Sequence, residues 1–214
     1  MPLASIVGTP AMAQNAAQNT AQSAAQSAAP NGPATAAQQQ AAAAFVADLS
    51  GKAFAVLQDE NLGRAEARAK FRELLRGNFD VDGTGLRLIR SYRAPNSPVK
   101  PTAAQLQAYR AALPDFLVNT YSDRLYDFST AKLTVVRAVP LGSRGDVNVF
   151  TRITDPKGGQ PIEAIWQVKG GARPLVANLV VNGVNIALTQ EADFKSYIDR
   201  NGFDALIDFM KQAK

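Results

Sequence analysis

The chain has 214 residues, and its 23 basic and 18 acidic side chains give a net charge of +5 and a pI near 9.6. It contains no cysteine and no histidine, which excludes disulfides, thiolate nucleophiles, Ser-His triads and imidazole-ligated zinc. The basic balance favours acidic partners, such as an anionic lipid surface or nucleic acid. A merely solubilising surface charge explains it equally well.

The N-terminal part differs from the rest, because no charged side chain occurs before Asp48. Within residues 1–13, Ala11-Met12-Ala13 has the small-x-small form of a signal-peptidase site. We interpret residues 1–13 as the remnant of a signal peptide that starts upstream, with a chance resemblance as the alternative. Residues 14–37 are rich in Ala, Gln and Ser and have almost nothing to bury, which predicts a disordered tether. Residues 38–214 are predicted to form a single domain. No segment beyond residue 13 approaches the roughly 20 apolar residues that span a bilayer.

The first half of this domain shows helical periodicity. Apolar residues at helical intervals predict helices over about 38–57 and 63–76. After the glycine-rich segment Asp82-Gly83-Thr84-Gly85, a short helix carries Leu86 to Tyr92. These glycines are followed by no Gly-Lys-Ser/Thr, so a nucleotide-binding loop is rejected. Thr102 and Gln105 form a capping box at the start of the longest helix, whose apolar stripe runs from Leu106 to Phe128.

From Ala131 the apolar period changes to two. Strands are predicted over 133–139, 146–154, 161–169 and 173–188, and short Gly/Pro connections make them an antiparallel meander. Asn182-Gly183 marks either a hairpin turn or a bulge within the last strand. Two short helices follow, the first beginning at Thr189-Gln190 and ending at Asn201-Gly202. The predicted fold class is α+β, with N-terminal helices packed on a four-stranded antiparallel twisted sheet that the two short helices follow.

Candidate catalytic groups are weak. Asp123 and Asp127 are spaced (i, i+4) as an acid pair could be, but Arg124 beside them favours a solvated helix face. Ser91, Ser122 and Ser143 have no histidine to activate them. We therefore predict no catalytic residue, no metal and no cofactor, and hence no enzyme. Nucleic acid is disfavoured as a partner, because the chain has no basic run and its strands do not alternate aromatic with basic residues.

An ordered set of short pieces extends from about Phe45 to Met210. The pieces are Phe71-Arg72-Glu73-Leu74-Leu75, Asn78-Phe79-Asp80-Val81, Phe116-Leu117, Thr120-Tyr121, Arg124-Leu125, Asp155-Pro156-Lys157-Gly158, Ile165-Trp166-Gln167-Val168, Gly183-Val184-Asn185, Leu188-Thr189-Gln190, Phe194 and Arg200-Asn201-Gly202. In this set the chain resembles the MlaC, or toluene-tolerance, family of periplasmic phospholipid carriers. It departs from that family at Asn178 and Asn182, where an acidic residue is common.

The resemblance implies a periplasmic lipid carrier that makes and breaks no bond. A sheet packed on helices would leave a deep apolar pocket for acyl chains, with the head group near its mouth. The implied partners are an inner-membrane ABC transporter with an MCE-domain protein and an outer-membrane lipoprotein complex. Shuttling between them would maintain outer-membrane lipid asymmetry. A carrier of hopanoid-type lipids and a ligand-free sheet-plus-helix interaction module stay open as alternatives.

The wall of that pocket is predicted from the apolar faces already described, and ordinary core packing remains the alternative role of each residue. The predicted wall consists of Leu75, Phe79, Tyr92, Leu113, Phe116, Leu117 and Tyr121 from the helices, and Val147, Val149, Trp166, Leu179 and Val181 from the sheet. Arg90 and Arg93 are the predicted positive charges near a head-group phosphate.

Overall fold

The computed structural model describes residues 32–97, 99–126, 129–171 and 173–213. The expected signal peptide and most of the expected tether lie outside these residues. The backbone of Gly32 pairs with that of Arg144, and Ala34 is buried in a cluster with sheet residues. The last residues of the segment that was expected to be disordered therefore contact the folded domain.

The first two helices begin and end within two residues of their predicted bounds. Helix α2 spans Ala36–Gln58 and α3 spans Arg64–Asn78. A capping box starts α2, because Thr35 Oγ1 accepts from the Gln38 N–H (3.3 Å) and Gln38 Oε1 accepts from the Thr35 N–H (2.7 Å). Within the described residues, α2 alone has the length and apolar composition to cross a membrane. That finding corrects the expectation that no such segment exists, although a helix packed on a sheet passes the same test.

The glycine-rich segment lies inside a helix, so the prediction that the helix follows it was wrong. Helix α4 spans Val81–Leu88 and is capped by Asp80, whose Oδ1 accepts from the Gly83 N–H (3.1 Å). Gly85 is buried there, and a Cβ added to it would collide with the side chain of Leu113. The glycine is therefore needed for close packing and not for a loop.

Two further helices complete this half of the chain. The short α5, Arg90–Arg93, follows α4, and α6 spans Ala103–Tyr126. The predicted capping box of α6 is confirmed: the Thr102 N–H donates to Gln105 Oε1 (2.8 Å) and the Gln105 N–H donates to Thr102 Oγ1 (3.2 Å).

The sheet is the predicted antiparallel meander, with one short strand added. Its strands are β1 (Lys132–Leu141), β2 (Asp146–Thr154), β3 (Ile162–Lys169), β4 (Leu175–Val181) and β5 (Val184–Asn185). They lie side by side in chain order, and each pairs antiparallel with the next. The α+β fold class is thereby confirmed, with five strands in place of four.

The last predicted strand, over 173–188, does not continue to its predicted end. Asn182 and Gly183 have φ of +47° and +81°, as a two-residue hairpin turn with two left-handed positions requires. The chain therefore turns back into β5. Helix α7, Ile186–Asn201, starts before Thr189, because Asn185 caps it by accepting from the Leu188 N–H (3.1 Å). Helix α8, Phe203–Gln212, follows Gly202, as predicted.

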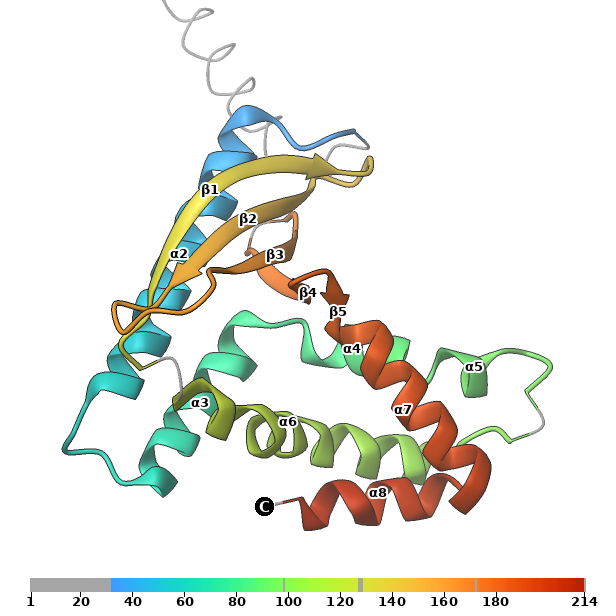
Figure 1. The fold of residues 1–214 in the computed structure, drawn as a ribbon. Coiled ribbons are helices and arrows are strands. Elements are labelled where there is room, and N and C mark those ends of the chain that lie inside the picture. The colour runs from blue at the N-terminus through green and yellow to red at the C-terminus, as the bar shows by residue number, and fades with distance from the viewer. Residues whose placement is uncertain (1–31, 98, 127–128, 172, 214) are drawn as a thin grey trace, which may run out of the picture.

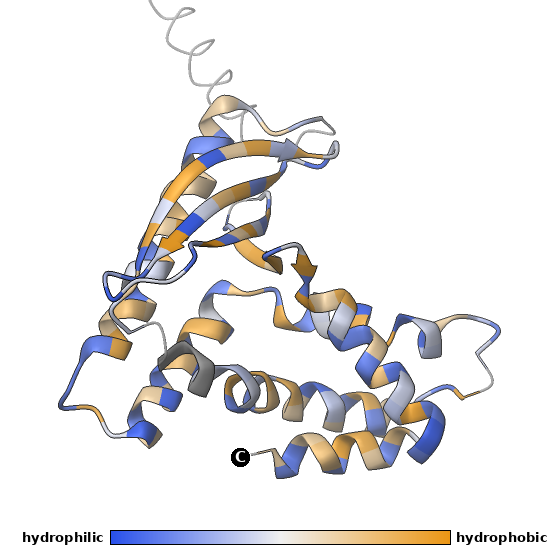
Figure 2. Ribbon diagram, viewed as in Figure 1, coloured by the Kyte–Doolittle hydropathy of each residue, from blue (hydrophilic) through white to orange (hydrophobic). Residues whose placement is uncertain are grey.

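The elements form a sheet half and a helical half (Figure 1). Helix α2 packs along β1 and β2, whereas α6 packs against α3 and α8. Helices α4 and α7 contact both β4 and the helical half. In Figure 2 the hydrophobic residues gather on α6, on α8 and along the strands, where they alternate with polar ones.

Two buried clusters correspond to these halves. The helical cluster consists of Leu88, Ile89, Tyr92, Tyr109, Ala112, Leu113, Phe116, Phe194, Ile198, Phe203, Leu206, Ile207 and Met210. The sheet cluster consists of Ala34, Ala42, Val46, Val147, Val149 and Val168. A smaller cluster of Leu57, Phe71 and Val118 joins α2, α3 and α6.

Candidate ligand-binding site

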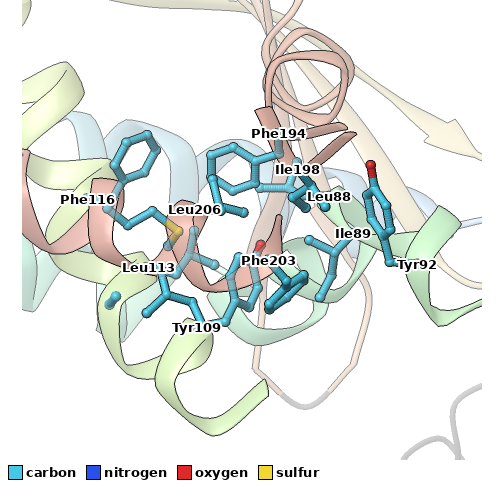
Figure 3. Close-up of a cluster of buried hydrophobic side chains, with 13 residues drawn as sticks. Leu88, Ile89, Tyr92, Tyr109, Leu113, Phe116, Phe194, Ile198, Phe203 and Leu206 are labelled. Atoms are coloured by element: carbon cyan, nitrogen blue, oxygen red, sulfur yellow. The ribbon is translucent and has the colours of Figure 1, made fainter. Parts of the chain in front are cut away.

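Four of the predicted wall residues lie in or beside the helical cluster. Tyr92, Leu113 and Phe116 are buried members, and Leu117 packs against it. Figure 3 shows Leu113, Phe116 and Tyr109 of α6 directed toward Phe194 and Leu206. The Phe116 and Phe194 rings lie 5.5 Å apart, within the usual range for aromatic pairs. These side chains pack against one another and form part of the protein core.

Tyr92 also carries the polar contacts of this cluster. Its hydroxyl donates to Asp199 Oδ1 (2.6 Å), and Lys195 Nζ lies 2.5 Å from the other oxygen of that carboxylate. The hydrogen bond from Lys195, together with the one from Tyr92, lowers the pKa of Asp199. Burial, with Asp199 beside it, raises the pKa of Tyr92. The contact ties α5 to α7. A carboxylate with a lowered pKa supports the fold above its ordinary pKa near 4, and that support is lost as the pH falls.

The five predicted sheet residues share one face. Val149 pairs with Trp166, and Trp166 pairs with Leu179, and directly opposed residues project to the same side of a sheet. Val147 lies two residues from Val149, and Val181 two from Leu179, so both follow the same alternation. Val147 and Val149 belong to the sheet cluster with Val46 of α2, which makes this the α2 face.

Coverage of the α2 face is uneven. Val147 and Val149 are fully buried, whereas Trp166, Leu179 and Val181 are only half-buried. The indole of Trp166 is oriented by its Nε1–H, which donates to Thr151 Oγ1 (3.0 Å). The α2 face therefore presents large apolar side chains that the described residues do not fully cover.

The remaining three wall residues are half-buried and lie on elements near β4. Leu75 and Phe79 are one turn apart at the end of α3, and Phe79 forms a bridge with Val176 of β4. Tyr121 of α6 donates to Oε1 of Gln190 on α7 (3.1 Å), and α7 contacts β4. The three residues therefore lie on or at the end of α3 and on α6, which contact each other, and both helices are linked to β4, directly or through α7.

A cleft of about 610 Å³ lies on the other side of the sheet, where α4 and the start of α7 meet β3, β4 and the β1–β2 turn. Arg90 lines it and pairs with Glu191 (Nε to Oε1, 2.7 Å). Arg93, the second predicted head-group residue, is exposed on α5 and is not among the residues lining the cleft. Of the two arginines that the sequence grouped together, Arg90 lines the cleft and Arg93 does not.

No cluster of ligands suited to a metal was found in the described part of the chain. Asp127 of the candidate acid pair lies outside the described residues.

Sequence reasoning missed two polar features. Gln190 is buried and was read only as a helix start. Hydrogen bonds join Gln167 of β3, Asn178 of β4 and Asn185 of β5. The turn Asn182-Gly183 was the available signal, because a hairpin there brings Asn185 back beside β4.

The fold and this face define the class: an α+β protein whose open antiparallel sheet keeps an incompletely covered apolar face. Residues 47–212 match the family model described as MlaC protein, so the chain belongs to the MlaC family, and the resemblance is confirmed. Among solved structures, it is similar to a phospholipid-binding protein from Ralstonia solanacearum, solved in complex with a phospholipid. The two are 18% identical, the match covers 80% of this chain and 96% of that one, and the TM-score is 0.65. At this identity the likeness shows a shared fold.

Proposed function

We propose that this protein is a periplasmic phospholipid carrier that holds acyl chains against the α2 face of its sheet. The observation that carries the proposal is the incomplete coverage of Trp166, Leu179 and Val181 beside fully buried neighbours. Membership of the MlaC family supports a carrier, and the phospholipid bound by the solved relative supports the ligand class. Leu75, Phe79 and Tyr121 would complete the wall, while the buried residues of the predicted set would support it from behind.

The energetics suit a carrier and explain why it would need partners. Each methylene moved out of water gains about 0.8 kcal/mol, so two long acyl chains gain roughly 20 kcal/mol before ordering costs. Spontaneous release would then be slow. Delivery to an inner-membrane ABC transporter with an MCE-domain protein, and exchange with an outer-membrane lipoprotein complex, would supply the release step. Shuttling between these partners would maintain outer-membrane lipid asymmetry.

A binding role also fits the chemistry available. With no histidine and no cysteine in the chain, the usual activated nucleophiles are missing. We therefore propose a carrier and not an enzyme. A hopanoid-type cargo stays as the alternative ligand, since an apolar wall selects poorly between lipid skeletons. A ligand-free interaction module is the alternative if no lipid binds.

Native mass spectrometry of the protein purified from a bacterial envelope tests the proposal. An added mass in the phospholipid range that is lost on denaturation is expected. An added mass matching a hopanoid would keep the carrier and change its cargo. A ligand-free mass, unchanged after incubation with phospholipid vesicles, would contradict the carrier function and favour the interaction module.

A further inference from the structure

The cleft beside α7 is separate from the apolar face proposed for acyl chains. It is lined by Gln167 and Asn178, which pair with each other in register. Their neighbours Trp166 and Leu179 belong to the α2 face, so these two amides project to the opposite side of the sheet. A volume of about 610 Å³ lies within the range of about 300–1,000 Å³ usual for small-molecule sites.

The orientation of the amides in this cleft is fixed by the backbone of α7. The Ala187 N–H donates to Asn178 Oδ1 (3.2 Å), and the Leu188 N–H donates to Asn185 Oδ1 (3.1 Å). Because a backbone N–H can only donate, both side chains must turn their oxygens toward it. Asn178 Nδ2 then donates to Asn185 Oδ1 (3.0 Å) and to Gln167 Oε1 (3.2 Å).

This network engages all three side-chain oxygens and leaves two NH₂ groups over. Both hydrogens of Asn178 Nδ2 are used, and each oxygen accepts at least one hydrogen bond. Among the described residues, no acceptor is hydrogen-bonded to Nε2 of Gln167 or Nδ2 of Asn185. The Ala187 and Leu188 N–H groups are already capped. Any recognition here therefore comes from the two amide NH₂ groups and the surrounding cations, not from the helix terminus.

The charged residues of the lining carry an excess of positive charge. Four are cationic and two are carboxylates: Arg87, Arg90, Arg144, Lys169, Asp146 and Glu191. Arg87 is held in place, because its Nη2 donates to Ala177 O and Thr84 Oγ1, each at 2.7 Å. Among the described residues, no acceptor is hydrogen-bonded to its Nε or Nη1, so these N–H groups can donate to a ligand.

The cations of the other three ion pairs are open to solvent, while their carboxylate partners are largely buried. The side chains of Arg90, Arg144 and Lys169 are 67%, 86% and 47% exposed, whereas those of Glu191, Asp146 and Asp80 are 18%, 18% and 14% exposed. Each cation has more N–H groups than its ion pair uses. It can therefore donate to an incoming anion without leaving its carboxylate.

We propose that this cleft binds a phosphate group, as a monoester or a diester. An oxyanion accepts from several donors at once, and bonds to charged donors are about twice as strong as neutral ones. Two free NH₂ groups and a guanidinium held by the backbone provide such a set. The inference does not rest on the proposed carrier function. The phosphate could belong to a lipid head group or to a small phosphorylated solute.

Asn185→Asp is the sharpest variant for this cleft. A carboxylate at position 185 still accepts from the Leu188 N–H and from Asn178, and Asp is as good a helix cap as Asn, so the fold should be kept. The change removes the NH₂ donor and adds a negative charge. Gln167→Glu does the same from β3.

Asn182→Asp is the matched control, because it makes the same chemical change in the β4–β5 turn, outside the lining. Asn182 Oδ1 accepts from the Glu163 N–H (2.9 Å), which Asp can also do.

The measurement has two arms on the full chain: calorimetric titration with inorganic phosphate, and retention of phosphatidylglycerol taken from vesicles, followed by phosphorus NMR. Wild type and Asn182→Asp are expected to bind inorganic phosphate within twofold of each other, and Asn185→Asp at least tenfold more weakly. If inorganic phosphate does not bind, a phosphorus shift of the retained lipid that changes only in Asn185→Asp and Gln167→Glu supports the site and assigns the phosphate to the head group.

The inference is overturned if Asn185→Asp and Asn182→Asp weaken phosphate binding equally, since that is an effect of net charge alone. It is also overturned if neither arm separates the cleft variants from the wild type. Equal lipid retention by all variants, with no difference among them in phosphate affinity or in the phosphorus shift, would remove this site and leave the carrier intact. Binding of inorganic phosphate by a protein that retains no phosphatidylglycerol would support the phosphate site and contradict the carrier function.

Discussion

The helical cluster and the α2 face of the sheet use the same kinds of side chain in opposite ways. In the helical cluster, Tyr109 contacts Phe194 and Phe203 with ring centroids 6.2 Å and 5.9 Å apart, and no part of Tyr109 is exposed. On the α2 face, the buried residues are small, among them Val147, Val149 and Ala164, while Trp166 and Leu179 remain half-buried. Burying apolar surface contributes about 25 cal/mol per Å², and surface left in contact with water does not contribute this stabilisation. The helical cluster is thus a closed core, whereas the α2 face has apolar area that a ligand could cover.

The largest effect is expected from truncating a side chain of the helical cluster. Leu206 is fully buried in the helical cluster, so Leu206→Ala should lower the free energy of unfolding by about 2–5 kcal/mol, through lost burial and the cavity left behind. Urea titration measures this loss. Lipid retained per folded molecule should not change. A loss under about 1 kcal/mol would mean that this core is loosely packed.

The same substitution, glycine to alanine, should change the free energy of unfolding in opposite directions at two positions. Gly85→Ala on α4 places a Cβ against Leu113 and should cost about 1–3 kcal/mol of stability, as overpacking usually does. Gly51 lies within α2 with no atom within 4 Å of an added Cβ, so Gly51→Ala should stabilise by up to about 1 kcal/mol. Thermal unfolding of the two variants against the wild type measures both. Two shifts of the same sign would contradict the tight packing of α4 or the open surroundings of α2.

Leu179→Ala tests the other half and should separate stability from binding. Because Leu179 is only half-buried, its truncation should cost about 1 kcal/mol, near the centre of measured substitutions. Under the proposed function, lipid retained per folded molecule should fall several-fold, as seen by native mass spectrometry. Leu206→Ala is its control, with the larger loss of stability and no loss of lipid. The reverse pattern would place the lipid in the helical half.

Much of the fold follows from local pattern. Alternating residues in β1 to β3 and the Thr102-Gln105 box were enough to predict those elements. The start of α4 was not predictable locally, because Gly83 and Gly85 argue against a helix until Leu113 is known to pack against position 85. The candidate site was harder still. Val149 and Leu179 look alike in sequence, and only the placement of α2 makes one core and leaves the other half-covered.

The smallest effect expected is an alkaline one, and it should belong to the helical half alone. Burial raises the pKa of Tyr109, and burial together with Asp199 raises that of Tyr92. Both tyrosines lie in the helical cluster. A tyrosine whose folded pKa lies above its unfolded value, near 10, gives its full stabilisation below that pH. The stabilisation is lost as the pH rises, because the unfolded chain releases its proton first.

At pH 10 the loss should be only about 0.4 kcal/mol for each tyrosine, and it should steepen above that pH. Urea unfolding at pH 8, 9 and 10 measures it. Tyr109→Phe should remove about half of this pH dependence. It should also lower stability at pH 8 by about 1 kcal/mol, because the hydrogen bond to Gly85 O (2.9 Å) is lost. Leu179→Ala should leave the slope unchanged, since it lies outside the helical cluster. A profile that stays as steep in Tyr109→Phe as in the wild type would contradict the assignment of this pH dependence to Tyr109.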